Sequence, residues 1–185
     1  MKVPHYHGVD SDDAWVRRVR NGAPKTGYTF TFQNIGQTAA WGNPVDTSPR
    51  PSFAKYSRTP FETGGQSYDM YLVDGRFRVA SAAAAFLHAS SGGSDNAAPI
   101  VVVHDFGPPQ NRGLAAYKDI LTIADRVGGC CLDSPTKTTV RIGSKYVETS
   151  SVTNSEASLV ILKRKPSVTD KDIERLWEQY KYVWH

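Results

Sequence analysis

Cysteine is nearly missing from this chain, and its two copies exclude a disulfide framework. Cys130 and Cys131 are adjacent in the 185-residue sequence, so they cannot join distant segments or supply a four-ligand zinc site. Long apolar runs are missing as well: none approaches the roughly 20 residues that span a bilayer, and the start of the chain lacks the apolar middle of a signal peptide. We therefore expect a cytoplasmic protein without a membrane partner.

Three common catalytic signatures are also missing. The sequence has no GxSxG nucleophile elbow, no P-loop and no HExxH motif, which argues against the commonest hydrolases and nucleoside triphosphatases. A net charge of +4 would suit an anionic partner, but the basic residues are scattered. We expect a small-molecule substrate rather than a nucleic acid, and the oligomeric state stays open.

What is present is the composition of one globular domain. With 39% hydrophobic and 22% charged residues, a chain of 185 residues can bury a substantial core. We expect residues 1–185 to form a single α/β domain.

The N-terminal third predicts a strand, a helix and a second strand. HYHGVD reads as a short strand ending at Asp10, and Ser11 can cap a helix that stops at Gly22. Alternating aromatic and polar residues over 28–32 indicate the second strand. The segment 36–67 shows no sustained periodicity and reads as a long loop. Its aromatics argue for a packed loop over the ligand edge, with Trp41 and Tyr56 against the body.

The remainder of the chain predicts further strands and helices. A strand over 68–73 leads into an alanine-rich helix reaching about residue 90, and the buried-type run after Pro99 ends in His104 and Asp105. A helix is expected over 112–127 and another over 170–182. Three strand-like stretches lie between these two helices: 130–133, 138–149 and 157–163.

This order predicts a Rossmann-like, mostly parallel sheet with flanking helices and an antiparallel C-terminal edge. Ligands of such sheets bind beyond the carboxyl ends of the strands. That rule selects Asp10, Asp74, His104 and Asp105 as candidate site residues.

Each candidate has a functional and a structural interpretation. Asp10 can accept hydrogen bonds from ribose hydroxyls or cap the next helix. Asp74 can hold a substrate amine, a hydroxyl or a cation while Arg76 clamps an anionic group, or the turn can simply be fixed by an aspartate–arginine pair. His104 can be a base or a metal ligand, or a structural histidine. The pattern assigns no metal centre.

Four segments carry a resemblance to a known family: YHGVDSDDAWVRRVR, NIGQTAAWGNPVD, YDMYLVDGRFRVA and VVVHDF. Together they resemble class I S-adenosylmethionine-dependent methyltransferases, over residues 6–127, and LVDGRFRVA is the most specific of them. The resemblance implies that Asp10 binds the cofactor ribose and that Ile35 and Gly36 lie near the adenine. It also implies that Asp74, His104 and Asp105 lie at the ends of the family's fourth and fifth strands and face the substrate. Together with Arg76, the possible anion clamp, Asp74 and His104 are the expected catalytic residues.

One departure from the family bears on activity. The family begins with a strand and a glycine-rich turn that cradles the methionine end of the cofactor, whereas this sequence starts at the family's second strand. The expectation is an S-adenosylmethionine-dependent methyltransferase-like protein that is shortened or inactive. Two alternatives stay open: a non-catalytic binding domain derived from that fold, and another nucleotide-dependent transferase.

Overall fold

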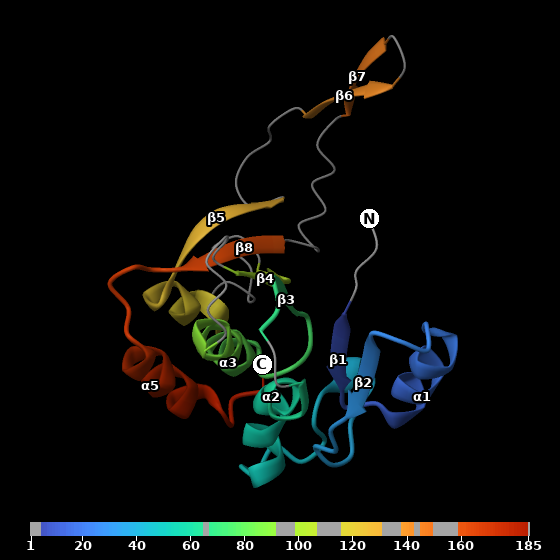
Figure 1. The fold of residues 1–185 in the computed structure, drawn as a ribbon, viewed down its shortest axis with the longest axis vertical. Coiled ribbons are helices and arrows are strands. Elements are labelled where there is room, and N and C mark those ends of the chain that lie inside the picture. The colour runs from blue at the N-terminus through green and yellow to red at the C-terminus, as the bar shows by residue number, and fades with distance from the viewer. Residues whose placement is uncertain are drawn as a thin grey trace.

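The computed structural model describes residues 5–64, 67–91, 99–106, 116–130, 138–142, 145–149 and 159–184. Strands and helices alternate through the first half of the chain and strands dominate the second (Figure 1). The strands are β1 (Tyr6–Asp10), β2 (Tyr28–Phe32), β3 (Met70–Val73), β4 (Ile100–His104), β5 (Ala124–Cys130), β6 (Thr138–Ile142), β7 (Lys145–Thr149) and β8 (Leu159–Arg164). The helices are α1 (Asp13–Gly22), α2 (Pro51–Gly64), α3 (Arg78–Ser91) and α5 (Asp170–Tyr180), with 3₁₀ turns η1 (Ala40–Gly42) and η2 (Lys118–Thr122).

The described strands form separate sheets rather than one. β1 and β2 make a parallel pair, and β3, β4, β8 and β5 make a four-stranded sheet in that order. In the larger sheet β3 and β4 are parallel, while β8 runs antiparallel to both β4 and β5. The α/β class and the antiparallel C-terminal edge are confirmed. The sheet is mixed and split, however, where a mostly parallel one was expected.

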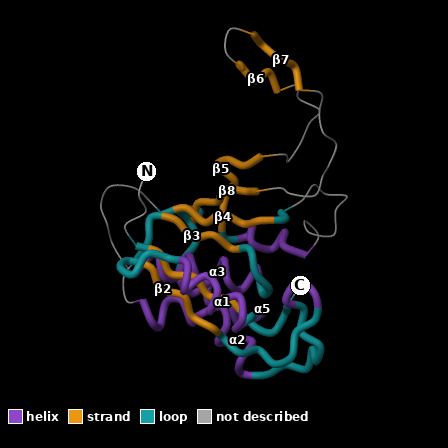
Figure 2. The backbone as a smooth tube through the Cα atoms, turned by 90° about the vertical axis from the view of Figure 1, so that its right-hand side faces the viewer, coloured by secondary structure: helices purple, strands orange, loops and turns teal. Residues whose placement is uncertain are grey.

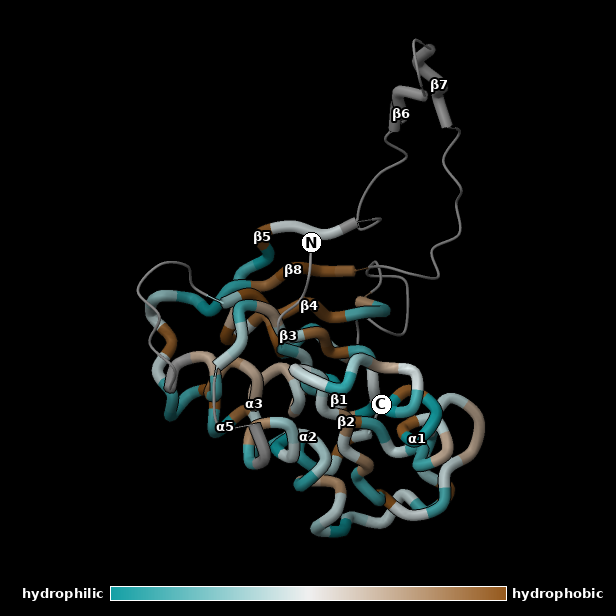
Figure 3. Tube along the Cα trace, turned by 45° about the vertical axis from the view of Figure 1, so that its right-hand side comes forward, coloured by the Kyte–Doolittle hydropathy of each residue, from teal (hydrophilic) through white to brown (hydrophobic). Residues whose placement is uncertain are grey.

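The core lies between the four-stranded sheet and its helices. Figures 1 and 2 show α3 and α5 on the same side of this sheet. Five of the six alanines of α3 are almost fully buried, and their small side chains let the helix approach the sheet closely. Val101 and Val103 of β4 are completely buried, as the apolar run predicts. In Figure 3, β4 and β8 stand out as the hydrophobic centre of the sheet.

Helix α2 corrects the expectation of a long loop over 36–67. Pro51 stands in the first turn, where a missing N–H costs nothing, and Phe53 and Tyr56 recur at helical spacing. Phe53 is completely buried against the ring of Phe77. Prolines before the helix, at its first position and inside it hid this period in the sequence. Trp41, expected to pack, is 86% exposed, so that expectation is wrong.

The helix predicted over 112–127 is confirmed at Ala116 and Tyr117 but is wrong beyond them. Lys118–Thr122 is a 3₁₀ turn, and β5 begins at Ala124. The apolar spacing is real, because Tyr117, Ile120 and Ala124 are buried. Pairing with β8 nevertheless overrides the helical period, and Gly128 and Gly129 are poor helix formers. Cys130 ends β5, and 131–133 of the expected strand 130–133 lie outside the described residues.

The first and last helices lie where the sequence predicts them. Helix α1 is capped by Asp12, whose side chain accepts a hydrogen bond from the Trp15 N–H, rather than by Ser11. Helix α5 has a reciprocal capping box between Thr169 and Asp172. Among the described helices, none combines the length and the apolar character that a membrane crossing needs.

A matched pair of aromatic substitutions tests whether the 36–67 segment packs as described. We expect Phe53→Ala to lower the free energy of unfolding by about 3–5 kcal/mol, because it opens a cavity in the core. Trp41→Ala, the control in the same segment, should change it by less than about 0.5 kcal/mol. Urea unfolding followed by circular dichroism measures both. Equal effects would contradict the packing of α2.

Candidate functional site

A cavity of about 400 Å³ lies between β1 and β3. Its walls come from the two strands, from helices α1, α2 and α3, and from Tyr68. The strand residues are Tyr6, His7, Gly8, Val9 and Asp10 of β1 and Tyr71, Leu72 and Val73 of β3, followed by Asp74, Gly75 and Arg76. This volume is within the range of small-molecule sites.

The cavity separates two strand edges. Side chains alternate between the faces of a strand, yet every residue of β1 lines the cavity, so β1 presents its edge there. In the part of the chain that the structure describes, β1 pairs only with β2 and β3 only with β4. The split in the sheet and the cavity are therefore the same feature.

Asp10 and Asp74 mark one end of this cavity, where β1 and β3 finish. Asp10 Oδ1 accepts a hydrogen bond of 2.8 Å from the Asp12 N–H, so it shapes the start of α1 while lining the cavity. Burial raises the pKa of Asp10, and the charge of Asp74 adds to this effect. The two carboxylates thus share one electrostatic environment.

Tyr56 lies among these charged groups. It is 8% exposed and lines the cavity from α2. Burial raises its pKa most, Asp10 and Asp74 raise it further, and the nearby arginines oppose them. Its hydroxyl stays protonated at neutral pH and can act as a hydrogen-bond donor.

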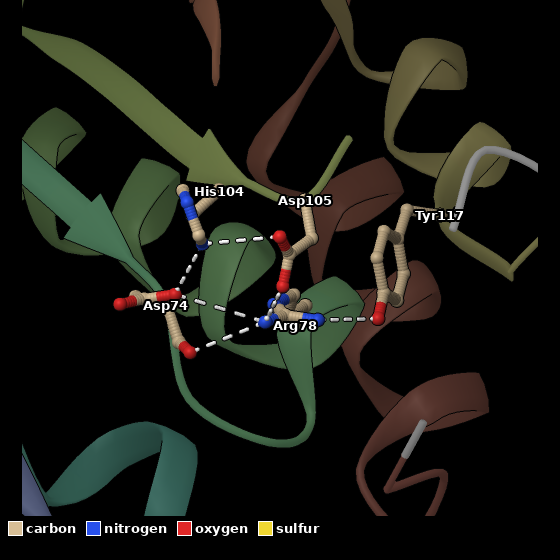
Figure 4. A network of polar contacts seen from close by, with 5 residues as sticks. All are labelled: Asp74, Arg78, His104, Asp105 and Tyr117. Carbon is tan, nitrogen blue, oxygen red and sulfur yellow. Dashed lines mark hydrogen bonds and ion pairs between the residues drawn. The ribbon is translucent and has the colours of Figure 1, made fainter. Parts of the chain in front are cut away.

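His104 bridges two carboxylates at the neighbouring strand ends (Figure 4). Its Nδ1 lies 2.7 Å from Asp74 Oδ1 and 3.3 Å from Asp105 Oδ1. Parallel pairing of β3 with β4 brings the three residues together, because Val73 is opposite Val103 and the next residues end the strands side by side. Asp74, at 59% side-chain exposure, connects this cluster to the cavity.

Arg78 supports the cluster from below. Its side chain is only 5% exposed, and its guanidinium donates to Asp105 Oδ2 at 2.9 Å, to the Asp74 carbonyl at 3.3 Å and to the Tyr117 hydroxyl at 2.6 Å. A buried guanidinium without such partners would be strongly unfavourable. One cation therefore ties together the ends of β3 and β4, the start of α3 and the segment before η2.

The backbone at the site is conformationally unusual. Asp105 has φ 56° and Phe77 has φ 57°, in the left-handed region that L-residues rarely adopt. Phe77 is held by complete burial, and Asp105 by its ion pair with Arg78. Asp105 directly follows β4 and Phe77 directly precedes α3, so these left-handed residues turn the chain at the end of that strand and at the start of that helix.

The predicted site residues fall into two groups. Asp10, Asp74 and Arg76 line the cavity, and His104 contacts Asp74 from the adjacent strand. Ile35 is buried in the hydrophobic core, and Gly36, with φ +95°, packs against the Arg50 guanidinium. Neither of these two is among the residues that line the cavity, so their adenine role stays a prediction.

Sequence reasoning missed three residues that organise the site. Tyr56 was expected to pack but not to line the cavity, and Tyr117 was expected on a helix face. Arg76 was preferred to Arg78, although the residue paired with Asp74 and Asp105 is Arg78. The four-residue spacing from Asp74 to Arg78 was the available signal, because residues at that spacing adjoin in a helical turn.

The arrangement offers two kinds of chemistry. The cavity can take up a ligand with hydroxyl groups through Asp10 and the Tyr56 hydroxyl. The Asp74, His104 and Asp105 cluster, whose potential ligand atoms lie within 4.8 Å of one another, can hold a cation or move a proton.

No protein-family model matches this chain, and neither does any curated protein. Among solved structures, a methyltransferase-like protein from Silicibacter pomeroyi is similar, with a TM-score of 0.57 and 21% sequence identity. The match covers 98% of this chain and 77% of that one. At this identity the likeness shows the fold alone, so this chain has a methyltransferase-like fold.

Arg78 lies closer to the carboxylate of Asp105 than to that of Asp74, and this difference can be tested by measuring stability. Asp105→Asn removes the charge closest to the buried guanidinium, and we expect it to lower the free energy of unfolding by about 1.5–3 kcal/mol. Asparagine tolerates the left-handed backbone, so strain adds little. Asp74→Asn, at the more distant and exposed carboxylate, should cost less than about 1 kcal/mol.

The control is the same Asp105→Asn change in an Arg78→Met background. There the cost should largely vanish, because no buried cation is left unpaired. Urea unfolding of the four proteins completes the cycle. A cost of Asp105→Asn that persists without Arg78 would contradict the assigned pairing.

Proposed function

We propose that this protein binds the nucleoside end of S-adenosylmethionine in the cavity between β1 and β3 and transfers its methyl group to a small-molecule acceptor at the Asp74, His104 and Asp105 cluster. The observation that carries the proposal is that Asp10 and Asp74 line one cavity at the carboxyl ends of their strands, where such folds bind ligands. The methyltransferase-like fold supports it.

The residues present fit part of this cofactor. A ribose needs an acceptor of hydrogen bonds at a strand end, and the Asp10 carboxylate, which the backbone of Ser11 and Asp12 also contacts, has further lone pairs that can accept them. A glycine-rich cradle for the methionine end is not found among the described residues of the cavity. A Cβ at Gly75 would clash with the Tyr56 hydroxyl, and one at Gly8 would lie 2.9 Å from the Tyr6 ring. Both glycines make room for tyrosines.

The acceptor side consists of Asp74 with His104. Bound S-adenosylmethionine would supply an electrophilic methyl group. Asp74 is exposed at the cavity and is placed to orient a hydroxyl or amine. His104 touches Asp74 and is placed to receive the acceptor's proton as the methyl group is transferred. Arg76, also at the cavity, would meet an anionic part of the acceptor.

The glycine packing also favours a second candidate function. A cavity that holds a nucleoside but offers no cradle for the methionine end suits a binding domain without catalysis. The two functions differ in ligand preference: a transferase must hold S-adenosylmethionine with its methyl group toward Asp74, whereas a binding domain would take adenosine equally well.

Asp10→Asn tests the cofactor site. Isothermal titration with S-adenosylmethionine should show affinity weakened by about 1.5–3 kcal/mol, because a charged acceptor of the ribose hydroxyls is lost. The asparagine oxygen can still accept from Asp12, so the fold is kept. Asp125→Asn, at an exposed carboxylate on β5, serves as the matched control and should bind like the parent. Undiminished affinity in Asp10→Asn would remove Asp10 from the site.

The raised pKa of Asp10 also predicts that the effect of Asp10→Asn on stability depends on pH. The raised pKa of Asp10 means that its ionised form is disfavoured in the folded state. This penalty is fully present above the folded pKa and disappears below the unfolded value of about 3.9. We therefore expect ligand-free Asp10→Asn to be more stable than the parent at pH 7, with the difference shrinking as the pH falls toward 4. Urea midpoints across this range measure it, and a constant difference would argue against the raised pKa.

A further inference from the structure

The geometry points to a divalent transition-metal site formed by Asp74, His104 and Asp105 at the ends of β3 and β4. The three side chains come from two neighbouring strands and offer two carboxylate oxygens and one imidazole nitrogen (Figure 4). Binding of the ion does not depend on the proposed methyl transfer. The metal ion would be bound in addition to the ligand proposed for the cavity between β1 and β3.

The distances between the ligand atoms suit a shared ion. His104 Nδ1 lies 2.7 Å and 3.3 Å from the nearest oxygens of Asp74 and Asp105. Two ligands at right angles around an ion, each about 2.1 Å from it, stand about 3 Å apart. The two separations from Nδ1 bracket that value, and all three ligand atoms lie within 4.8 Å of one another, so an ion could be accepted with side-chain adjustments.

The histidine atom facing the carboxylates is buried and lacks a hydrogen bond. Despite its short contacts, Nδ1 has no hydrogen-bond partner among the described residues, because neither oxygen lies in line with the nitrogen. A protonated imidazole paired with aspartate would place its N–H along the contact. Atoms that approach closely without pointing at each other are instead typical of ligands directed at a common third atom.

Arg78 orients the carboxylate of Asp105, one of the three proposed metal ligands. It holds Asp105 Oδ2 at 2.9 Å and leaves Oδ1 on the side of His104. Outer contacts of this kind orient carboxylate ligands and restrict their motion. With two carboxylates and one guanidinium, the cluster has a net charge of −1 when His104 is neutral, which favours a cation.

The donor set and its exposure define the class of ion. An imidazole nitrogen beside two carboxylates favours Mn²⁺, Fe²⁺, Co²⁺ or Zn²⁺ over Ca²⁺, which takes six to eight oxygens. The side chains of Asp74, His104 and Asp105 are 59%, 32% and 41% exposed, so water or an acceptor can reach the remaining positions. An acceptor hydroxyl bound there would lose its proton to solvent more readily, and His104 would then be a ligand rather than the base.

Titration of the full chain with MnCl₂, without S-adenosylmethionine, tests the site. Loss of the electron paramagnetic resonance signal of free Mn²⁺ should report one bound ion per chain. Electron spin-echo modulation should show coupling to a directly bound imidazole nitrogen. ZnCl₂ should displace the Mn²⁺, because zinc binds such sites more tightly, and CaCl₂ should not at the same concentration.

Two variants and their controls locate the ion. Asp74→Asn and His104→Gln should each weaken Mn²⁺ binding by about tenfold or more, and His104→Gln should abolish the nitrogen coupling. Asp125→Asn and His5→Gln, which remove a remote carboxylate and a remote imidazole, should bind like the parent. Circular dichroism checks that each variant is folded.

Several outcomes would overturn the site. These are no Mn²⁺ binding by the folded parent protein, binding without nitrogen coupling, and binding that survives unchanged in both Asp74→Asn and His104→Gln. Because no cofactor is present in the titration, a negative result leaves the methyl-transfer proposal standing. Conversely, failure of the chain to bind S-adenosylmethionine leaves the metal result intact.

Discussion

The buried charge of Arg78 is the constraint on which the site depends. A guanidinium withdrawn from water must be neutralised and hydrogen-bonded, and here Asp105, the Asp74 carbonyl and Tyr117 do so. Meeting that requirement fixes where β3 and β4 end and where α3 begins. It also fixes which oxygen of Asp105 faces His104. The buried guanidinium of Arg78 therefore helps to hold the more exposed side chains of the cluster in place.

The split between β1 and β3 is the second organising feature. Two strand edges that would pair in a continuous sheet instead enclose a cavity, with α1, α2 and α3 contributing to the remaining walls. The cavity contains Asp10, an acid at a strand end that suits a nucleoside. It also contains Gly8 and Gly75, where the space of a side chain is taken by Tyr6 and Tyr56. That combination is the basis for proposing a nucleoside ligand, and no glycine-rich cradle is found among the described residues that line the cavity.

Local pattern was sufficient for several elements. The buried run of β4, the alanine-rich α3 and the capped α5 were predicted because each has a strong period and clear ends. Helix α2 was missed because its prolines resemble loop signals, although Pro51 occupies a position that helices accept. The helix expected over 112–127 does not continue beyond Tyr117, for the opposite reason. A helical period was present, and pairing of β5 with β8 prevailed over it.

The sequence alone determined the α/β class and placed Asp10, Asp74, His104 and Asp105 at strand ends, because strand boundaries follow from local apolar runs and turn residues. Which of these residues meet was decided by tertiary structure, since strand pairing is non-local. Parallel register joined Asp74 to His104, and the separation of β1 from β3 put Asp10 across a cavity from them. Tertiary structure also decided that Arg78, and not Arg76, organises the site. The two arginines are close in sequence but differ in burial, and only a buried cation needs charged and hydrogen-bonding partners around it.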